Sequence, residues 1–171
     1  EFCQHVFEQT GQKIWVIYGA EEAQLAAQGV LLGWPGSYGL VCDLGGSSME
    51  LAEINRGLVG STITSDLGPL KLQELEGGPA ARKAYIRKTM QRLADDMGPQ
   101  QNRLFLVGGS WRALARVDMQ RTDYPLRVLH EYRMGRNSVI KTLAFVEEDG
   151  LEALQELCGI SQSRISLLPY A

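Results

Sequence analysis

The chain has 171 residues, of which 44% are hydrophobic and 22% are charged. This length is enough for one α/β core with an appended segment. The formal net charge is −3, so no overall basic surface attracts a polyanion, and recognition of phosphate must come from a local site. Nucleic acid is therefore disfavoured as the main partner.

The cysteines and the lack of a membrane segment or signal peptide indicate the cellular compartment. Cys3, Cys42 and Cys158 are far apart and share no metal-ligand spacing with the two histidines, which argues against a disulfide framework or a structural zinc site. No apolar run approaches the ~20 residues that span a bilayer, and no signal peptide is evident. We expect a soluble, cytoplasmic protein that binds no membrane. Because the chain starts without Met and ends without obvious completion, we expect a fragment.

The first part of the chain predicts a short strand and a helix before a break. Residues 13–18 (KIWVIY) are β-rich, and the Ala- and Glu-rich residues 21–30 favour a helix. Glycine and proline in residues 33–36 then interrupt the pattern. Because a new sheet is predicted after this break, we place a domain boundary here, between residues 1–36 and residues 37–171.

The next segment predicts a three-stranded antiparallel meander, because three β-rich runs are separated by short, glycine-containing turns. These strands are residues 38–43, 49–54 and 58–64. A long helix follows, and its apolar residues recur at helical spacing, which predicts one continuous apolar face. These residues are Ile86, Met90, Leu93 and Met97.

The remaining elements complete a recognisable order. Residues 104–107 (LFLV) are apolar throughout and predict a strand buried on both faces, and residues 108–110 lead from it into a helix through Met119. The order β-β-β-α-β-α predicts a ribonuclease H-like α/β domain with a mixed sheet and helices on both faces. Two more amphipathic helices are predicted, one around residues 139–146 and one around residues 151–157.

The most informative stretch runs from Asp43 to Glu50 and reads DLGGSSME. A carboxylate stands where a predicted strand ends, and the glycines and serines that follow can present N–H and hydroxyl donors to an anion. Asp43 beside such a loop is well placed to hold a hydrated Mg²⁺. A simple turn is the alternative interpretation of Gly45 and Gly46.

A second glycine pair, Gly108 and Gly109, follows the fourth predicted strand and leads through Ser110 into a helix. Helix N-termini attract anions, so this junction is a second candidate phosphate contact. A plain N-cap role is the alternative for Ser110. Because the two glycine loops follow two strands of one sheet, we expect them to face the same cleft.

The stretch from Asp43 to Glu50 resembles the D-[IL]-G-G-G-S-x-E phosphate motif of the Ppx/GppA family, the exopolyphosphatases and guanosine pentaphosphate phosphohydrolases of the actin-like ATPase superfamily. Three other stretches resemble family segments in the expected order. They are Gly19-Ala20-Glu21-Glu22-Ala23, Leu67-Gly68 with Lys71-Leu72, and Val107-Gly108-Gly109-Ser110. The resemblance covers nearly the whole chain, but the family's N-terminal D-x-G-S-N-S motif is absent. It implies that residues 1–36 end the first actin-like domain with its crossover helix, and that residues 37–171 form most of the second domain.

The resemblance also implies roles for individual residues. Glu22 would be the general base that activates water for attack on a terminal phosphoryl group, and Asp43 and Glu50 would bind Mg²⁺ or another divalent cation. The phosphate-binding residues would be Gly45, Gly46, Ser47, Ser48, Gly108, Gly109 and Ser110. Ser47 stands where the family usually has a third glycine, which would strain the loop if that position needs a positive φ. On the residues alone, Glu21 and Glu22 are also typical of a helix N-terminus.

The function expected from these features is Mg²⁺-assisted release of the terminal phosphate of inorganic polyphosphate or of guanosine pentaphosphate. The expected binding partners are polyphosphate and guanosine penta- or tetraphosphate. Two alternatives stay open: a sugar or acetate kinase-like ATPase, and a non-catalytic sensor that binds a nucleotide or polyphosphate. The resemblance further allows a homodimer of the full-length protein. It implies that the fragment alone is inactive, since half of the cleft is missing.

Overall fold

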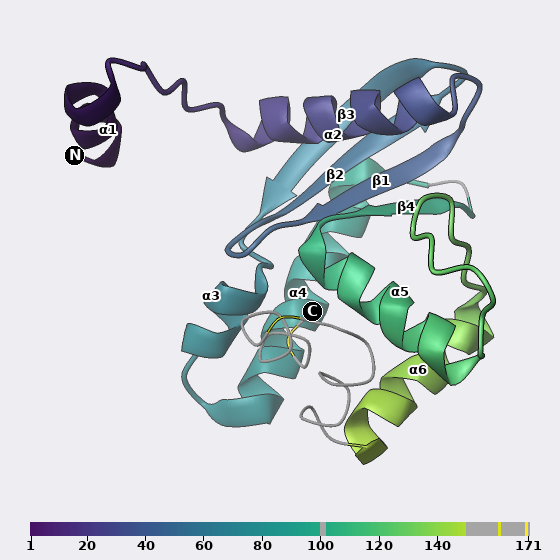
Figure 1. Ribbon diagram of the computed structural model, residues 1–171. Coiled ribbons are helices and arrows are strands. Elements are labelled where there is room, and N and C mark those ends of the chain that lie inside the picture. The colour runs from purple at the N-terminus through teal and green to yellow at the C-terminus, as the bar shows by residue number, and fades with distance from the viewer. Residues whose placement is uncertain (100–101, 150–160, 162–169, 171) are drawn as a thin grey trace.

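The computed structural model describes residues 1–99 and 102–149, together with Ser161 and Tyr170. A four-stranded mixed sheet forms its centre, with the strand order β3-β2-β1-β4 (Figure 1). The strands are β1 (Gly39–Leu44), β2 (Met49–Asn55), β3 (Leu58–Ser65) and β4 (Leu104–Val107). The helices are α1 (Phe2–Thr10), α2 (Gly19–Gly33), α3 (Pro69–Glu74), α4 (Gly78–Met97), α5 (Gly109–Arg121) and α6 (Arg136–Asp149).

The predicted meander and the predicted β-β-β-α-β-α order are confirmed. Strand β2 pairs antiparallel with β1 and β3, whereas β1 pairs parallel with β4. A parallel pair needs a long crossover, and α3 and α4 supply it between β3 and β4. The parallel pairing brings the C-terminal ends of β1 and β4 to the same edge of the sheet, where ligands bind in many α/β folds.

Helix α2 covers one face of the sheet (Figure 1). Its small residues Ala23 and Ala27 are 1% and 0% exposed and belong to the same buried cluster as Val41 and Ala52 of the central strands. Small side chains let the helix backbone approach the sheet closely. Helix α2 therefore packs on the sheet that follows it in the sequence, and the domain division at residue 36 stays a prediction.

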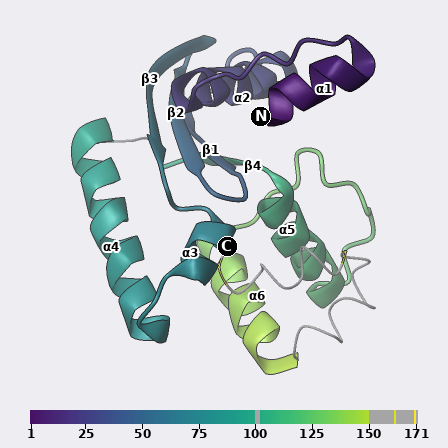
Figure 2. The ribbon, with the colours of Figure 1, turned by 90° about the vertical axis from the view of Figure 1, so that its left-hand side faces the viewer.

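The opposite face is covered by α3, α4 and α5 (Figure 2). Because side chains alternate along a strand, Cys42 and Leu44 point to this face while Val41 points to α2. They pack with Leu72 of α3 and Leu93 of α4 in a second buried cluster, where each fully buried aliphatic side chain contributes about 1.5–3 kcal/mol. Helix α6 packs on α5.

Residues 13–18 do not form the predicted strand. They are an irregular connection between α1 and α2 that extends away from the sheet, and no described strand lies beside them (Figure 1). Trp15, Val16 and Tyr18 are 78%, 77% and 82% exposed. The prediction is wrong for this structure because a β-rich segment becomes a strand only where a second strand accepts its backbone hydrogen bonds.

The predicted burial of β4 on both faces is also wrong for the described residues. Phe105 packs in the cluster under α2 and is 9% exposed, but Leu104 and Leu106 are 53% and 41% exposed. The reason is position: β4 is an edge strand of the sheet. Apolar composition predicted the strand itself but not its place in the strand order.

The positions of the helices were predicted better than the burial of their side chains. On α4, Leu93 is buried, whereas Ile86 and Met90 are 37% and 44% exposed, because α4 meets the sheet at its edge strand β3. Helix α6 matches the predicted helix around residues 139–146, and the one predicted around residues 151–157 lies outside the described residues. Within the described ranges, no helix combines the length and apolar character needed to cross a bilayer.

Candidate functional site

Four residues form one row across the sheet, on the face that carries α2. The strand register pairs Thr64 with Glu50, Glu50 with Asp43, and Asp43 with Val107. Because side chains alternate along a strand, this row points to the same face as Val41, which packs under α2. The two predicted metal ligands therefore lie side by side, near the edge where β1 and β4 end.

Glu50 is a buried carboxylate with one unpartnered oxygen. It is 2% exposed, and its Oε1 accepts a hydrogen bond from Thr64 Oγ1 at 3.0 Å. Its Oε2 is buried and has no hydrogen-bond partner in the described part of the chain. A buried carboxylate oxygen without a partner is unfavourable, so this atom is the part of the site that most needs a ligand.

Asp43 is half-buried at the end of β1. Burial raises the pKa of Asp43, the Glu50 carboxylate raises it further, and the Arg112 guanidinium lowers it. Neighbouring carboxylates repel each other, and a cation between them relieves that repulsion. Among the described residues, no group of three or more acidic, His or Cys side chains forms a cage for a metal. Mg²⁺ needs only one or two carboxylates when water and phosphate complete its shell, so this pair fits it.

The loop between β1 and β2 offers free backbone donors. The Gly45 N–H donates to the Ser48 carbonyl at 3.0 Å and closes the turn. The N–H groups of Gly46 and Ser47 donate to no other group within the described ranges, and both residues are exposed. Successive free N–H groups can bind an anion, so this loop is a candidate phosphate contact.

Ser47 fits the loop without backbone strain. Apart from glycine, the described residues with a positive φ are Arg56, Asp123 and Glu131. Ser47 is not one of them, so its side chain meets none of the crowding that a left-handed conformation would cause. The replacement of the family's usual third glycine is therefore tolerated by the backbone.

The turn at Leu67 and Gly68 supports this loop from α3. The Leu70 N–H donates to the Gly46 carbonyl at 2.8 Å. A Cβ on Gly68 would collide with backbone atoms of Gly46 and Ser47. Only glycine permits such a close approach of two backbones, so Gly68 fixes the position of the loop of residues 45–48.

The second glycine loop touches the end of β1, directly before the first glycine loop. Gly108 has a φ of +113°, and a Cβ there would lie 2.5 Å from the Leu44 carbonyl oxygen and 3.2 Å from Asp43 Oδ1. Gly108, and not Ser110, is the N-cap residue of α5, so the plain N-cap role considered for Ser110 is wrong. Gly109 and Ser110 form the first turn of α5, next to Asp43.

The N-terminus of α2 lies at the same end of the sheet. A Cβ on Gly19 would lie 2.8 Å from Thr64 Oγ1, the hydroxyl group that donates to Glu50. The first turn of α2 is therefore held beside the carboxylate row. This contact brings the Glu21-Glu22 segment to the same region as the two glycine loops.

The two glutamates of this segment have different surroundings. Glu21 Oε2 accepts a hydrogen bond from the Tyr18 N–H at 2.8 Å and so caps the helix. Glu22 is exposed in the first turn, and in the described structure no hydrogen bond or ion pair joins it to Asp43 or Glu50. Helix capping therefore accounts for Glu21 and leaves the carboxylate of Glu22 available.

Comparison with known proteins assigns the chain to a family. Residues 1–170 match the sequence profile of the Ppx/GppA phosphatase family. The chain belongs to this family. A search of curated proteins finds no match.

Solved structures share the fold. An exopolyphosphatase from Cytophaga hutchinsonii superposes with a TM-score of 0.79 at 18% identity, over 98% of this chain and 58% of that protein. A Ppx/GppA family member from Aquifex aeolicus gives a TM-score of 0.69 at 18% identity, over 99% of this chain and 57% of that protein. The chain thus spans less than two thirds of either protein. The predicted family and ribonuclease H-like α/β fold are confirmed, and the roles of single residues stay predictions.

The sequence interpretation missed two residues that lie beside the candidate site, Thr64 and Arg112. Thr64 lies opposite Glu50 in the meander, so a correct strand register would have found it. Arg112 follows Gly108 by four residues on α5, and its Nε donates to the Gly108 carbonyl at 3.2 Å. Helical spacing from the glycine motif was the available signal for Arg112.

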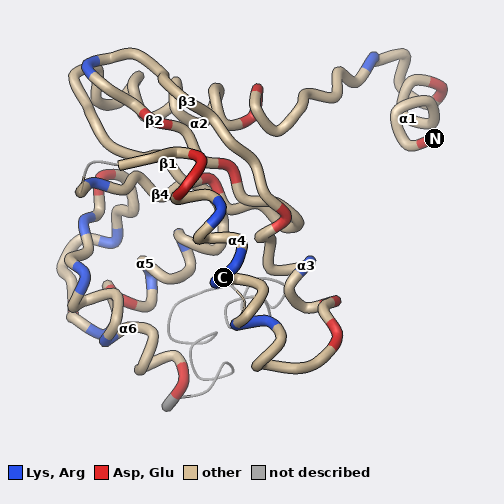
Figure 3. Tube along the Cα trace, turned by 180° about the vertical axis from the view of Figure 1, so that it is seen from behind, with Lys and Arg blue, Asp and Glu red and all other residues tan. Residues whose placement is uncertain are grey.

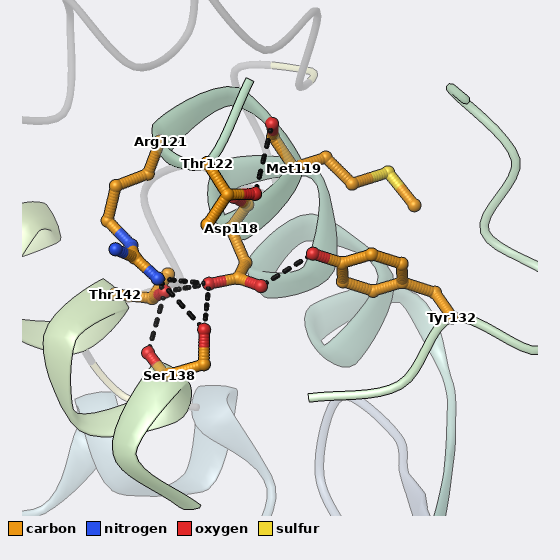
Figure 4. Close-up of polar contacts among 7 residues, drawn as sticks. All are labelled: Asp118, Met119, Arg121, Thr122, Tyr132, Ser138 and Thr142. Atoms are coloured by element: carbon orange, nitrogen blue, oxygen red, sulfur yellow. Dashed lines mark hydrogen bonds and ion pairs between the residues drawn. The ribbon is translucent and has the colours of Figure 1, made fainter. Parts of the chain in front are cut away.

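A second polar cluster, toward the other end of α5, was also missed (Figure 4). Asp118 is 2% exposed and accepts hydrogen bonds from Thr142, Ser138 and Arg121 on Oδ1 and from Tyr132 on Oδ2, at 2.6 to 2.8 Å. Burial raises the pKa of Asp118, but these four hydrogen bonds outweigh it and lower the pKa to about 2. Both oxygens are satisfied, so this cluster joins α5 to the following loop and α6.

Proposed function

We propose that the protein containing this chain is a phosphohydrolase that releases the terminal phosphate of a phosphoanhydride. The observation that carries the proposal is the meeting of two carboxylates and two glycine loops at one end of the sheet. Asp43 and Glu50 are neighbours in the strand register, and Gly108 abuts Asp43. Membership of the Ppx/GppA phosphatase family and the fold shared with an exopolyphosphatase support the same class of reaction.

Asp43 and Glu50 would hold a divalent cation, with Mg²⁺ the expected one. The carboxylate of Asp43 and the unpartnered Oε2 of Glu50 are the available ligands. When bound, the cation neutralises charge on the phosphate groups. Thr64 keeps Glu50 in place by donating to its other oxygen.

The chain supplies the rest of the phosphate contacts. The free N–H groups of Gly46 and Ser47, the Ser48 hydroxyl and the first turn of α5 at Gly109 and Ser110 bind phosphate oxygens. These donors are fixed before the substrate arrives, since Gly68 and Gly108 hold both loops in place. Fixed donors stabilise the charge that develops on the transferred group.

Glu22 is the proposed general base. Its carboxylate takes a proton from a water molecule as the water oxygen bonds to the terminal phosphorus. The bond from that phosphorus to the bridging oxygen breaks, and orthophosphate and the shortened phosphate chain leave. Glu21 is committed to the helix cap, so Glu22 is the member of the pair that is free for this role.

Inorganic polyphosphate and guanosine pentaphosphate are the two substrates proposed, because each ends in a phosphoanhydride that these groups can bind. The alternative of a non-catalytic sensor rested on Ser47, and its unstrained backbone removes that argument. The kinase alternative requires a binding site for a small phosphate acceptor. No feature of the described residues indicates such a site.

The test is phosphate release from both substrates by the natural protein that contains this chain, with Mg²⁺ and with EDTA. The proposal predicts release with Mg²⁺ and none with EDTA. Acceptor-dependent formation of ADP from ATP would support the kinase instead. Tight binding of polyphosphate without release would support the sensor. A folded protein that neither binds nor hydrolyses either substrate would overturn the proposal.

A further inference from the structure

Arg112 places a positive charge beside the proposed phosphate site. It lies on α5, where its Nε donates to the Gly108 carbonyl at 3.2 Å. Gly108 in turn lies against Asp43, since a Cβ there would be 3.2 Å from Asp43 Oδ1. The electrostatics agree: burial and Glu50 raise the pKa of Asp43, whereas Arg112 lowers it.

The hydrogen bond to Gly108 orients the guanidinium but leaves most of its donors unused. Within the described structure, the terminal nitrogens of Arg112 make no hydrogen bond or ion pair, and Asp43 is not within ion-pair distance. The side chain is exposed. A guanidinium held through Nε presents its remaining N–H groups as a planar fork, which matches two oxygens of a phosphate.

Arg121, also on α5, is an arginine with a structural role and can be compared with Arg112. Arg121 donates through Nε to Thr142 and through its terminal nitrogen to Asp118 and Ser138, so its donors are used within the protein. Arg112 has no such network. Basic segments are frequent on the side of the fold that carries α5 and α6 (Figure 3). Salt screens charges that lie farther apart than about a Debye length, so Arg112 acts mainly on groups near it.

We propose that Arg112 binds an oligophosphate directly, at the Gly108 side of the proposed phosphate site. This inference rests on the proposed function and names a further substrate contact of that site. The loop of residues 45–48 and Arg112 flank Asp43 from β1 and α5, so a ligand with several linked phosphates contacts both. A ligand with a single phosphate gains less from Arg112.

The test measures the Kd of tripolyphosphate by calorimetry on the natural protein, with Mg²⁺ and with EDTA. Arg112→Gln removes the charge, and Arg112→Lys keeps it without the fork. Arg56→Gln is the matched control, because Arg56 is exposed in the β2–β3 turn at the opposite end of the sheet. We expect the Kd to rise about 10- to 100-fold for Arg112→Gln and less for Arg112→Lys, with no change for Arg56→Gln.

Each outcome decides the proposal. An unchanged Kd for folded Arg112→Gln in both conditions overturns it, as does a wild-type protein that does not bind tripolyphosphate. A loss seen with Mg²⁺ but not with EDTA also overturns it, because Arg112 then acts only through Asp43. If Arg112→Gln loses its near-ultraviolet circular dichroism, the Arg112→Lys variant decides. The two proposals can fail separately. If the wild-type protein releases no phosphate but binds tripolyphosphate more tightly than Arg112→Gln does, this inference is supported and the proposed hydrolase is refuted.

Discussion

Thr64 on β3 donates a hydrogen bond from Oγ1 to Oε1 of Glu50 on β2, at 3.0 Å. This bond holds the buried carboxylate in one orientation and leaves its second oxygen without a protein partner in the described structure. The second oxygen is thus a buried polar atom that its protein neighbours in the described structure leave unsatisfied. A buried carboxylate oxygen without a partner destabilises the fold, and the cation proposed at Asp43 and Glu50 would relieve that cost.

Mg²⁺ should therefore raise the melting temperature of the protein, and Glu50→Gln should abolish that rise. A ligand that binds only the folded state stabilises it by about 2.7 kcal/mol at one hundred times its Kd. Glu53→Gln is the matched control, because Glu53 is on the same strand but pairs with Leu40, away from Asp43. Thermal unfolding at increasing Mg²⁺ checks this. An equal rise in wild type and Glu50→Gln would show that Mg²⁺ binds elsewhere.

Replacing Gly68 by Ala should damage the loop of residues 45–48, which is the proposed phosphate contact. The new Cβ would meet backbone atoms of Gly46 and Ser47, which cannot move aside as a flexible side chain could. We expect a loss of about 1–3 kcal/mol in the free energy of unfolding, measured by urea denaturation. The control is Gly29→Ala in α2, where nothing lies within 4 Å of the new atom and helix propensity predicts a gain of about 0.5–1 kcal/mol. Wild-type stability for Gly68→Ala would rule out the close approach.

Asp118 should make stability depend on pH below neutrality. Its pKa is lowered from 3.8 to about 2 in the folded state, because four hydrogen bonds outweigh the effect of burial. A lowered pKa means that the stabilisation is present above the unfolded-state pKa and is lost as the pH falls toward the folded-state value. The contribution is about 2 kcal/mol at neutral pH and disappears between about pH 5 and pH 2.

Denaturant unfolding between pH 2 and pH 7 measures this contribution. Asp118→Asn should be less stable than wild type at pH 7 and should lose much of the pH dependence. Tyr132→Phe removes one of the four hydrogen bonds and should cost about 1 kcal/mol, with the carboxylate still present. Parallel pH profiles for wild type and Asp118→Asn would contradict the role of this cluster.

The features predicted well from the sequence are those with a local signal. The glycine motifs after β1 and β4 and the meander depend on neighbouring residues, and their positions agree with the structure. The predicted helices α2 and α6 extend up to three residues farther at each end than the sequence pattern indicated, and the short helix α3 was not predicted. The segment of residues 13–18 failed because a strand also requires a partner strand, which its own residues do not specify. The exposure of Leu104 and Leu106 likewise depends on strand order, which composition does not reveal.

The Asp118 cluster could not be predicted because it is assembled from distant positions. Its donors Tyr132, Ser138 and Thr142 lie 14, 20 and 24 residues farther along the chain. Periodicity does not report which polar side chains meet across a helix–helix contact. At the candidate site, the contact between Gly108 and Asp43 follows from the parallel pairing of β1 and β4. The unpartnered oxygen of Glu50 could not be predicted, because it depends on the positions of all neighbouring side chains.

The most direct test of the central claim compares Glu22→Gln with Glu21→Gln. Single-turnover phosphate release from polyphosphate, with Mg²⁺ and the natural protein, reports the chemical step. The account predicts that Glu22→Gln slows release by about 10²- to 10⁴-fold and leaves tripolyphosphate binding intact. Glu21→Gln should keep the wild-type rate and lose about 0.3–1 kcal/mol of stability, because Glu21 caps α2. Equal rates for wild type and Glu22→Gln would contradict the account.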